Sequence, residues 1–208
     1  MSTLIQFAGA SRSFPDGPLE MSGDGQIFAG ADAGDAYAGF RRDGVFAAIE
    51  LDHDLLARHI GLDRDPAHAR TVGFARFRMG DAAPSMLVEL VHLPWTEPMA
   101  IAAARAAFES AGLSVALCGD TPGRIVNRLI RPYLNAVLRR LDDGLASAED
   151  MDTTLRLGLG YPEGPHAMLA RTGLADHFAA TNALYVMTGD PDLAPARRAR
   201  VAAERAGL

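Results

Sequence analysis

Histidines that could act as bases or metal ligands are few in this chain of 208 residues. The sequence holds six, and two of them, His53 and His59, lie in the stretch "DHDLLARH". Residues three or four apart on a helix face the same side, whereas an offset of six puts the two imidazoles on different faces. We therefore expect no metal site.

Lysine is absent, because all 20 basic residues are arginine. A phosphate-loop nucleoside triphosphatase needs a lysine in its glycine-rich loop, and Schiff-base or pyridoxal phosphate chemistry needs a lysine amine. Both classes are excluded. A coding bias toward arginine and alanine is the simpler cause of the absence, but the exclusion holds either way.

Two glycine-rich stretches resemble a dinucleotide-binding loop, which has the form GxGxxG between a strand and a helix. "GDGQIF" from Gly23 has Phe28 at the third glycine position and continues into an apolar run. "GLGYPE" from Gly158 has a proline where the helix should start. No such loop follows the first apolar run, "TLIQFAG", so we interpret neither stretch as a cofactor loop.

The composition bounds the partners and the compartment. The net charge is −6, which disfavours nucleic acid, and no apolar run approaches the roughly 18 residues that span a membrane. Cys118 is the only cysteine, which we interpret as a small hydrophobic residue, and neither end carries a signal-peptide pattern. We expect a cytoplasmic protein that binds neither nucleic acid nor membrane.

The elements that must position any functional group differ between the two halves. Before Asp120, short apolar runs predict six strands, and the Gly- and Pro-rich stretch 11–25 predicts a loop. Helical spacing predicts helices over 51–61 and over 96–112, the second with Thr96 as N-cap and Gly112 as its end. The strands are expected in residues 3–9, 25–30, 44–51, 71–78, 85–93 and 113–118. Strands that alternate with helices predict a mostly parallel sheet.

After Asp120 the pattern is helical throughout. A long helix is predicted from Pro122 to Gly144 with a kink at Pro132, and Ser147 opens a capping box with Asp150. A turn over 160–165 precedes further helices at 173–189 and 194–207, the last with a solvated face that includes Arg197, Arg198 and Arg200. We predict a truncated Rossmann-like α/β domain over 1–119 and an all-α domain over 120–208.

The stretch "DTPGRIVNRLIRPYLNAVLRRLDDGLASAEDMDTTLRLGLGYPEGP", residues 120–165, resembles the C-terminal helical domain of the 3-hydroxyacyl-CoA dehydrogenase family. The sequence pattern of the family is close to "DTPGFIVNRL" at the start of this stretch and "GxGxPMGP" at its end. The resemblance is good from about Thr71 onward and poor before it, which implies that the first half of the nucleotide-binding domain is lost or replaced.

The resemblance implies a dimer through the helical domain and hydride transfer from a 3-hydroxyacyl-CoA to NAD in fatty acid metabolism. Family enzymes use a histidine base held by a glutamate, and an asparagine at the start of the long helix. By position, Glu89 matches the glutamate and Asn127 the asparagine, so these are the catalytic candidates. Asn127 also joins Pro162, Gly164 and Pro165 as a candidate substrate-binding residue.

The departures from the family concern the base itself. The family histidine, as in "GLHFFNPVPVMKLVEV", corresponds to Phe77, and no histidine occurs from residue 73 to 84. Arg76 and Arg78 stay protonated and cannot accept a proton. His92, three residues beyond Glu89 on the same expected strand, should face the opposite side of the sheet. The family's acidic positions after Gly164 are occupied by Ala167, Ala170 and Ala175.

These observations leave three hypotheses open. The favoured one is a reduced family member that keeps a homodimer and an acyl-CoA-like cleft but does not bind NAD in the usual way. The others are an active NAD-dependent dehydrogenase with a rebuilt N-terminus, and a structural subunit of a full-length relative. Without its histidine, Glu89 is expected to be a structural, arginine-paired carboxylate, whereas for Asn127 we favour contact with a ligand over a bond to a loop.

Overall fold

The computed structural model describes residues 2–38 and 44–207. They form two compact units. The sheet unit comprises the chain up to Arg78 together with Ala83–Ile125. The helical unit comprises Met79–Ala82 together with the chain from Val126 onward. Each unit is described by itself below.

The sheet unit is built on six strands whose order in the sheet follows their order in the chain. All neighbouring strands are parallel except β4 and β5, which are antiparallel. The connection between these two, residues 77–86, contains no helix that could carry the chain back across the sheet. The strands are β1 Leu4–Phe7, β2 Gly25–Ala29, β3 Phe46–Glu50, β4 Thr71–Arg76, β5 Leu87–His92 and β6 Ser114–Gly119. Each predicted strand is present, and the predicted mostly parallel sheet is confirmed.

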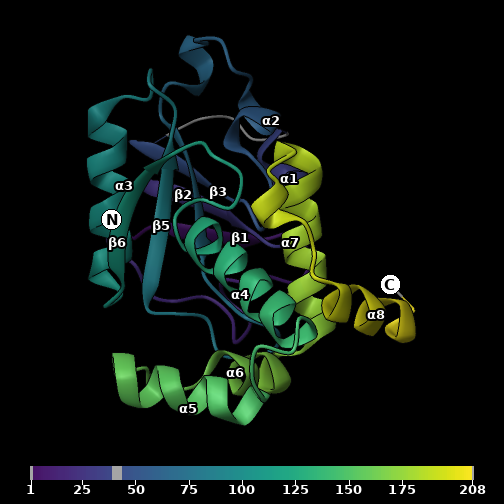
Figure 1. The fold of residues 1–208 in the computed structure, drawn as a ribbon. Coiled ribbons are helices and arrows are strands. Elements are labelled where there is room, and N and C mark those ends of the chain that lie inside the picture. The colour runs from purple at the N-terminus through teal and green to yellow at the C-terminus, as the bar shows by residue number, and fades with distance from the viewer. Residues whose placement is uncertain (1, 39–43, 208) are drawn as a thin grey trace. The chain divides into compact units, whose positions relative to one another are not determined.

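Helices cover both faces of this sheet (Figure 1). On one face α3, Pro98–Ser110, packs Phe108 against Phe74 of β4, with ring centroids 5.1 Å apart. On the other face α1, Ala33–Ala38, and α2, Leu56–Ile60, bury Tyr37 and Leu56. Burial of each such side chain contributes about 1.5–3 kcal/mol, so the alternating apolar residues of the strands hold both helical layers.

The helices of the sheet unit differ from the prediction at their ends. The helix expected over 51–61 is confined to Leu56–Ile60, because Asp52 has a φ of 23° and breaks the first turn. Glu97 stands at the N-cap of α3, while the Thr96 hydroxyl accepts a hydrogen bond from the Leu93 N–H instead. The predicted N-cap role of Thr96 was therefore wrong. Helix α1 was not predicted.

The helical unit contains α4 Val126–Asp142, α5 Ala148–Leu159, α6 Pro165–Thr172, α7 Leu174–Thr188 and α8 Arg197–Ala206. Two short 3-10 helices, Pro66–His68 in the sheet unit and Pro191–Leu193 in the helical unit, also occur in the described part of the chain. The confirmed fold class is thus an α/β sheet followed by helices. None of the described helices is long and apolar enough to span a bilayer.

Several details of the helical unit agree with the sequence and three do not. Pro132 lies inside α4, and Ser147 caps α5 by accepting from the Asp150 N–H. The Asp150 carboxylate accepts from the Ser147 hydroxyl at 2.7 Å and not from its backbone. Helix α4 begins at Val126 instead of Pro122, because Gly123 and Arg124 have φ angles of 78° and 53°, which no α-helix accommodates. Helix α6 was not predicted.

Candidate functional site

Glu89 lies in the middle of β5 and is 1% exposed. Its Oε1 accepts from the Ile125 N–H at 2.8 Å, and its Oε2 lies 3.4 Å from the Arg124 Nε. Arg124 is itself buried, and its guanidinium also donates to the Asp52 carbonyl. Glu89 therefore holds the turn before α4 in place through an arginine, as the interpretation of an arginine-paired carboxylate expected.

Arg124 cannot serve as the missing base. A guanidinium stays protonated in proteins and only donates hydrogen bonds. Burial, and then the charge of Glu89, raise the pKa of Cys118 on neighbouring β6 to about 11, so that thiol also keeps its proton at neutral pH. Arg124 and Cys118, both near Glu89, are therefore not ready to remove a proton from an alcohol.

Phe77 and His92 do not alter this conclusion. Phe77 directly follows β4 and has no group that titrates. His92 is the last residue of β5, and its Nδ1 lies 3.2 Å from the Leu93 carbonyl. Side chains three positions apart on a strand face opposite sides, so His92 and Glu89 lie on different faces of the sheet.

The carboxylate of Asp120, the first residue of the stretch that resembles the family, caps helix α2. It accepts hydrogen bonds from the Leu56 and Ala57 N–H groups, both at 2.8 Å. The N–H groups in the first turn of a helix have no acceptor within the helix, and a carboxylate at this end is favourable. The chain after β6 is thereby fixed to the helix that follows β3.

The carboxyl ends of β1, β2 and β3 are where a nucleotide would bind in a fold of this kind. There Glu50, the last residue of β3, accepts from the Ser11 hydroxyl, the Ser13 N–H and the Gly30 N–H, each at 2.7 Å. Backbone N–H groups that could hold a pyrophosphate thus face an internal carboxylate, and its negative charge would repel a phosphate. These residues do not fit NAD held in the usual way.

Asn127 is the second residue of α4 and is 5% exposed. Its Oδ1 accepts from the Nε of Arg131, which is 1% exposed and contacts the Nδ1 of His177 through Nη1 at 3.1 Å. The His177 Nε2 lies 3.0 Å from the Asn135 Oδ1, and the Asn135 amide donates to the Thr181 hydroxyl at 2.9 Å. Asn127 therefore ends a buried polar network between α4 and α7.

The protonation state of His177 follows from this network. Burial, and then the charge of Arg131, lower the pKa of His177 to about 3, so the imidazole is neutral near pH 7. Since Arg131 only donates, Nδ1 must accept and Nε2 must carry the proton that goes to Asn135. The sequence offered no signal for this pairing, because the partners lie 42 and 46 residues apart.

Pro162, Gly164 and Pro165 shape the turn between α5 and α6. Pro162 is exposed, whereas Pro165 is buried at the first position of α6. A Cβ on Gly164 would lie 2.2 Å from the Asp152 Cγ, so only glycine leaves room for that carboxylate. Asp152 in turn caps α6 through the N–H groups of His166 and Ala167.

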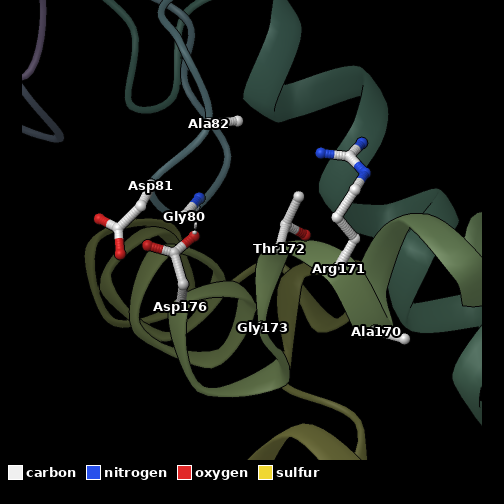
Figure 2. Close-up of a pocket in the computed structure, with 8 residues that line it drawn as sticks. All are labelled: Gly80, Asp81, Ala82, Ala170, Arg171, Thr172, Gly173 and Asp176. Carbon is white, nitrogen blue, oxygen red and sulfur yellow. Dashed lines mark hydrogen bonds between the residues drawn. The ribbon is translucent and has the colours of Figure 1, made fainter.

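A pocket of about 520 Å³ lies within the helical unit, between the 80–82 segment and the junction of α6 and α7 (Figure 2). The Asp176 carboxylate accepts from the Gly80 N–H at 2.9 Å across it. Arg171 at its rim donates two hydrogen bonds to Glu163, at 3.0 and 2.7 Å. The lining contains none of the predicted site residues. It consists of Gly80, Asp81, Ala82, Ala170, Arg171, Thr172, Gly173 and Asp176.

Comparison with known protein families identifies a match that nearly coincides with the helical unit. A family model described as the 3-hydroxyacyl-CoA dehydrogenase C-terminal domain matches residues 123–208. The helical unit belongs to the 3-hydroxyacyl-CoA dehydrogenase family. The predicted resemblance is confirmed.

Individual relatives extend the likeness beyond this unit. The mitochondrial hydroxyacyl-coenzyme A dehydrogenase of Sus scrofa is 40% identical over 109 residues, which are 52% of this chain and 35% of that protein. The crystal structure of (S)-3-hydroxybutyryl-CoA dehydrogenase from Ralstonia eutropha is 26% identical, with a TM-score of 0.73. The match covers 88% of this chain and 66% of the Ralstonia chain. FadB2 of M. tuberculosis, 22% identical with a TM-score of 0.71 and the same coverages, shares the fold.

The chain thus spans about a third of the length of the mammalian relative that it matches. The sheet unit shares the fold of the solved relatives, which supports its description as Rossmann-like. Sequence reasoning missed Arg124 as the partner of Glu89, although this arginine stands where the family wording has phenylalanine. That replacement, next to the loss of the histidine, was the available signal.

Proposed function

We propose that the chain is a reduced member of the family that binds an acyl-CoA-type ligand without NAD-dependent dehydrogenation. One observation carries the proposal. The carboxylate that matches the family glutamate is bound to Arg124 and the Ile125 N–H, and Phe77 stands where the family has its histidine. Hydride transfer from an alcohol requires that its proton be accepted, and neither of these partners accepts one.

Two further contacts support the loss of dehydrogenation. The Glu50 carboxylate takes the backbone N–H groups of Ser13 and Gly30 at the strand ends where a pyrophosphate would bind. The likeness of the helical unit to the family supports retention of an acyl-CoA ligand. Asn127, matched to the family asparagine, is the residue proposed to contact that ligand.

Thermal unfolding of the full chain with separate ligands tests the proposal. Acetoacetyl-CoA should raise the melting temperature, whereas NAD and NADH should leave it unchanged, and 3-hydroxybutyryl-CoA should not be oxidised. Asn127→Ala should reduce the shift produced by acetoacetyl-CoA. A shift with NADH together with turnover would establish the active dehydrogenase instead, and no shift with any acyl-CoA would refute ligand binding.

A second candidate, a protein whose role is to pair through its helical unit, is favoured by α5. This helix of 12 residues has no buried residue, and it exposes 82% of Leu157 and 67% of Leu159. The two leucines are two positions apart and face different sides of the helix, so each adds exposed apolar area that a partner could cover separately. Pairing with a second copy is compatible with ligand binding, so the two roles need separate experiments.

A further inference from the structure

Strand β6, Ser114–Gly119, lies at one end of the strand order of the sheet, next to β5. The two strands are parallel, and the Ser114 N–H donates to the Met86 carbonyl at 2.9 Å. Because alternate residues of a strand bond to the same neighbour, Ala116 and Cys118 also direct their N–H and C=O groups toward β5. The residues that direct these groups outward are Val115, Leu117 and Gly119.

The backbone groups on this outer side are largely without partners. In the described part of the chain, the Val115 carbonyl accepts a hydrogen bond from the Arg105 Nη2 at 3.1 Å. Among the same residues, no hydrogen bond reaches the N–H of Val115 or Gly119, or either backbone group of Leu117. A row of such groups at the edge of a sheet is a template for pairing with another extended chain.

The features that usually protect an edge strand are absent from β6 itself. These are a charged residue, a proline or a bulge. The sequence of β6, SVALCG, has neither charge nor proline, and all six residues pair with β5 in an unbroken register. Leu117 is 41% exposed and lies on the same face as Val115, which packs against the core cluster under α3. The edge therefore offers free backbone groups beside an exposed apolar side chain.

The geometry and charge of this edge select an extended peptide as its occupant. A chain in β conformation matches the spacing of alternate residues of β6. A second copy that paired through β6 alone would contact a strip about 20 Å long and about 5 Å wide, well below the roughly 1,000 Å² that a stable interface buries. A transient peptide complex does not need that area. The net charge of −6 favours basic over acidic residues beside the paired segment.

We propose that β6 is a docking site for an extended peptide segment of a partner protein, with an apolar core and basic flanks. The segment adds to the sheet as a further strand next to β6. It pairs antiparallel, which is the more stable arrangement, and places an apolar side chain beside Leu117. This inference concerns the sheet unit and does not depend on the acyl-CoA ligand.

Amide NMR of the full chain, titrated with a synthetic peptide, tests this inference. The probe is an acetylated and amidated peptide of alternating valine and threonine with a lysine at each end. Its binding should shift the N–H resonances of Val115, Leu117 and Gly119, because these groups gain acceptors. The N–H resonances of Ala116 and Cys118, which already donate to β5, should shift less.

Matched controls separate strand pairing from nonspecific attraction. The same peptide with proline in place of each threonine cannot form a ladder and should not bind. Leu117→Lys places a charge at the edge and should weaken binding of the valine and threonine peptide about fivefold. Leu62→Lys, at a position of the sheet unit that is 77% exposed, adds the same charge elsewhere and should retain the affinity.

Several outcomes would overturn the inference. One is the absence of any shift at β6 with the peptide, and another is an equal shift at all residues of the strand. Equal binding of the proline peptide would show that the backbone is not what is recognised. If the same three N–H resonances move with protein concentration alone, the occupant is a second copy and not a peptide. If Leu117→Lys does not fold, the comparison of the two peptides on the wild type decides.

Discussion

At the scale of single residues, the pair of Glu89 and Arg124 makes a prediction about stability. Their side chains are 1% and 3% exposed, so loss of either one leaves a buried charge without its partner. Arg124→Leu should therefore lower the free energy of unfolding by about 3–5 kcal/mol, measured by urea denaturation. Glu89→Leu combined with Arg124→Leu should recover most of that loss, because no uncompensated charge remains. A single variant within 1 kcal/mol of the wild type would show that the pair is not coupled.

His177 predicts how stability depends on pH. Its folded pKa is about 3, below the unfolded value of 6.5, so the unfolded state binds the proton first as the pH falls. The stabilisation is complete above pH 6.5 and is lost progressively toward pH 3, with about 2–3 kcal/mol lost by pH 4.5. Urea denaturation at pH 7 and at pH 4.5 measures this loss. His177→Gln, which does not titrate, should show a smaller decrease, and an equal decrease would refute the assignment.

At the scale of elements, the strands were predictable and several helix ends were not. Apolar runs bounded by turn residues predict all six strands, because a sheet covered on both faces needs apolar residues along the whole strand. The start of α4 depends instead on Glu89, which lies 36 residues before Ile125 and accepts its N–H. Helix α1 depends on burial of Tyr37, and its six residues are too few for a periodic pattern. Contacts between distant residues determine these ends.

The junction of α5 and α6 predicts opposite effects for two glycines. Gly164→Ala would place a Cβ 2.2 Å from the Asp152 Cγ and disrupt the cap of α6, so it should lower the unfolding free energy by about 2 kcal/mol or more. Gly158→Ala, in α5 with no atom within 4 Å of the new Cβ, should be neutral or raise stability by about 0.5–1 kcal/mol. Thermal denaturation compares the two variants. Similar effects at both positions would contradict the packing argument.

At the scale of the whole molecule, the two units relate to the family in different ways. The helical unit keeps the sequence of the family, so the likeness could be recognised from residues 120–165 alone, although α6 was not predicted and α4 begins later than expected. In the sheet unit the sequence showed that Phe77 stands where the family has its histidine. It did not show that Arg124 pairs with Glu89. Arg124 and the contacts of Glu50 join residues that are far apart in the chain, and no local pattern encodes such contacts.

Association of the chain through α5 is the last prediction. Leu157 and Leu159 lie near the end of that helix, so arginine at both positions removes apolar surface and is favourable near a helix C-terminus. If α5 pairs with a second copy, sedimentation velocity should show a dimer for the wild type and a monomer for the double variant, with unchanged circular dichroism. Leu62→Arg, in the sheet unit and 77% exposed, is the matched control and should remain dimeric. A wild-type monomer at all concentrations, or a double variant that still dimerises, would exclude α5 as the interface.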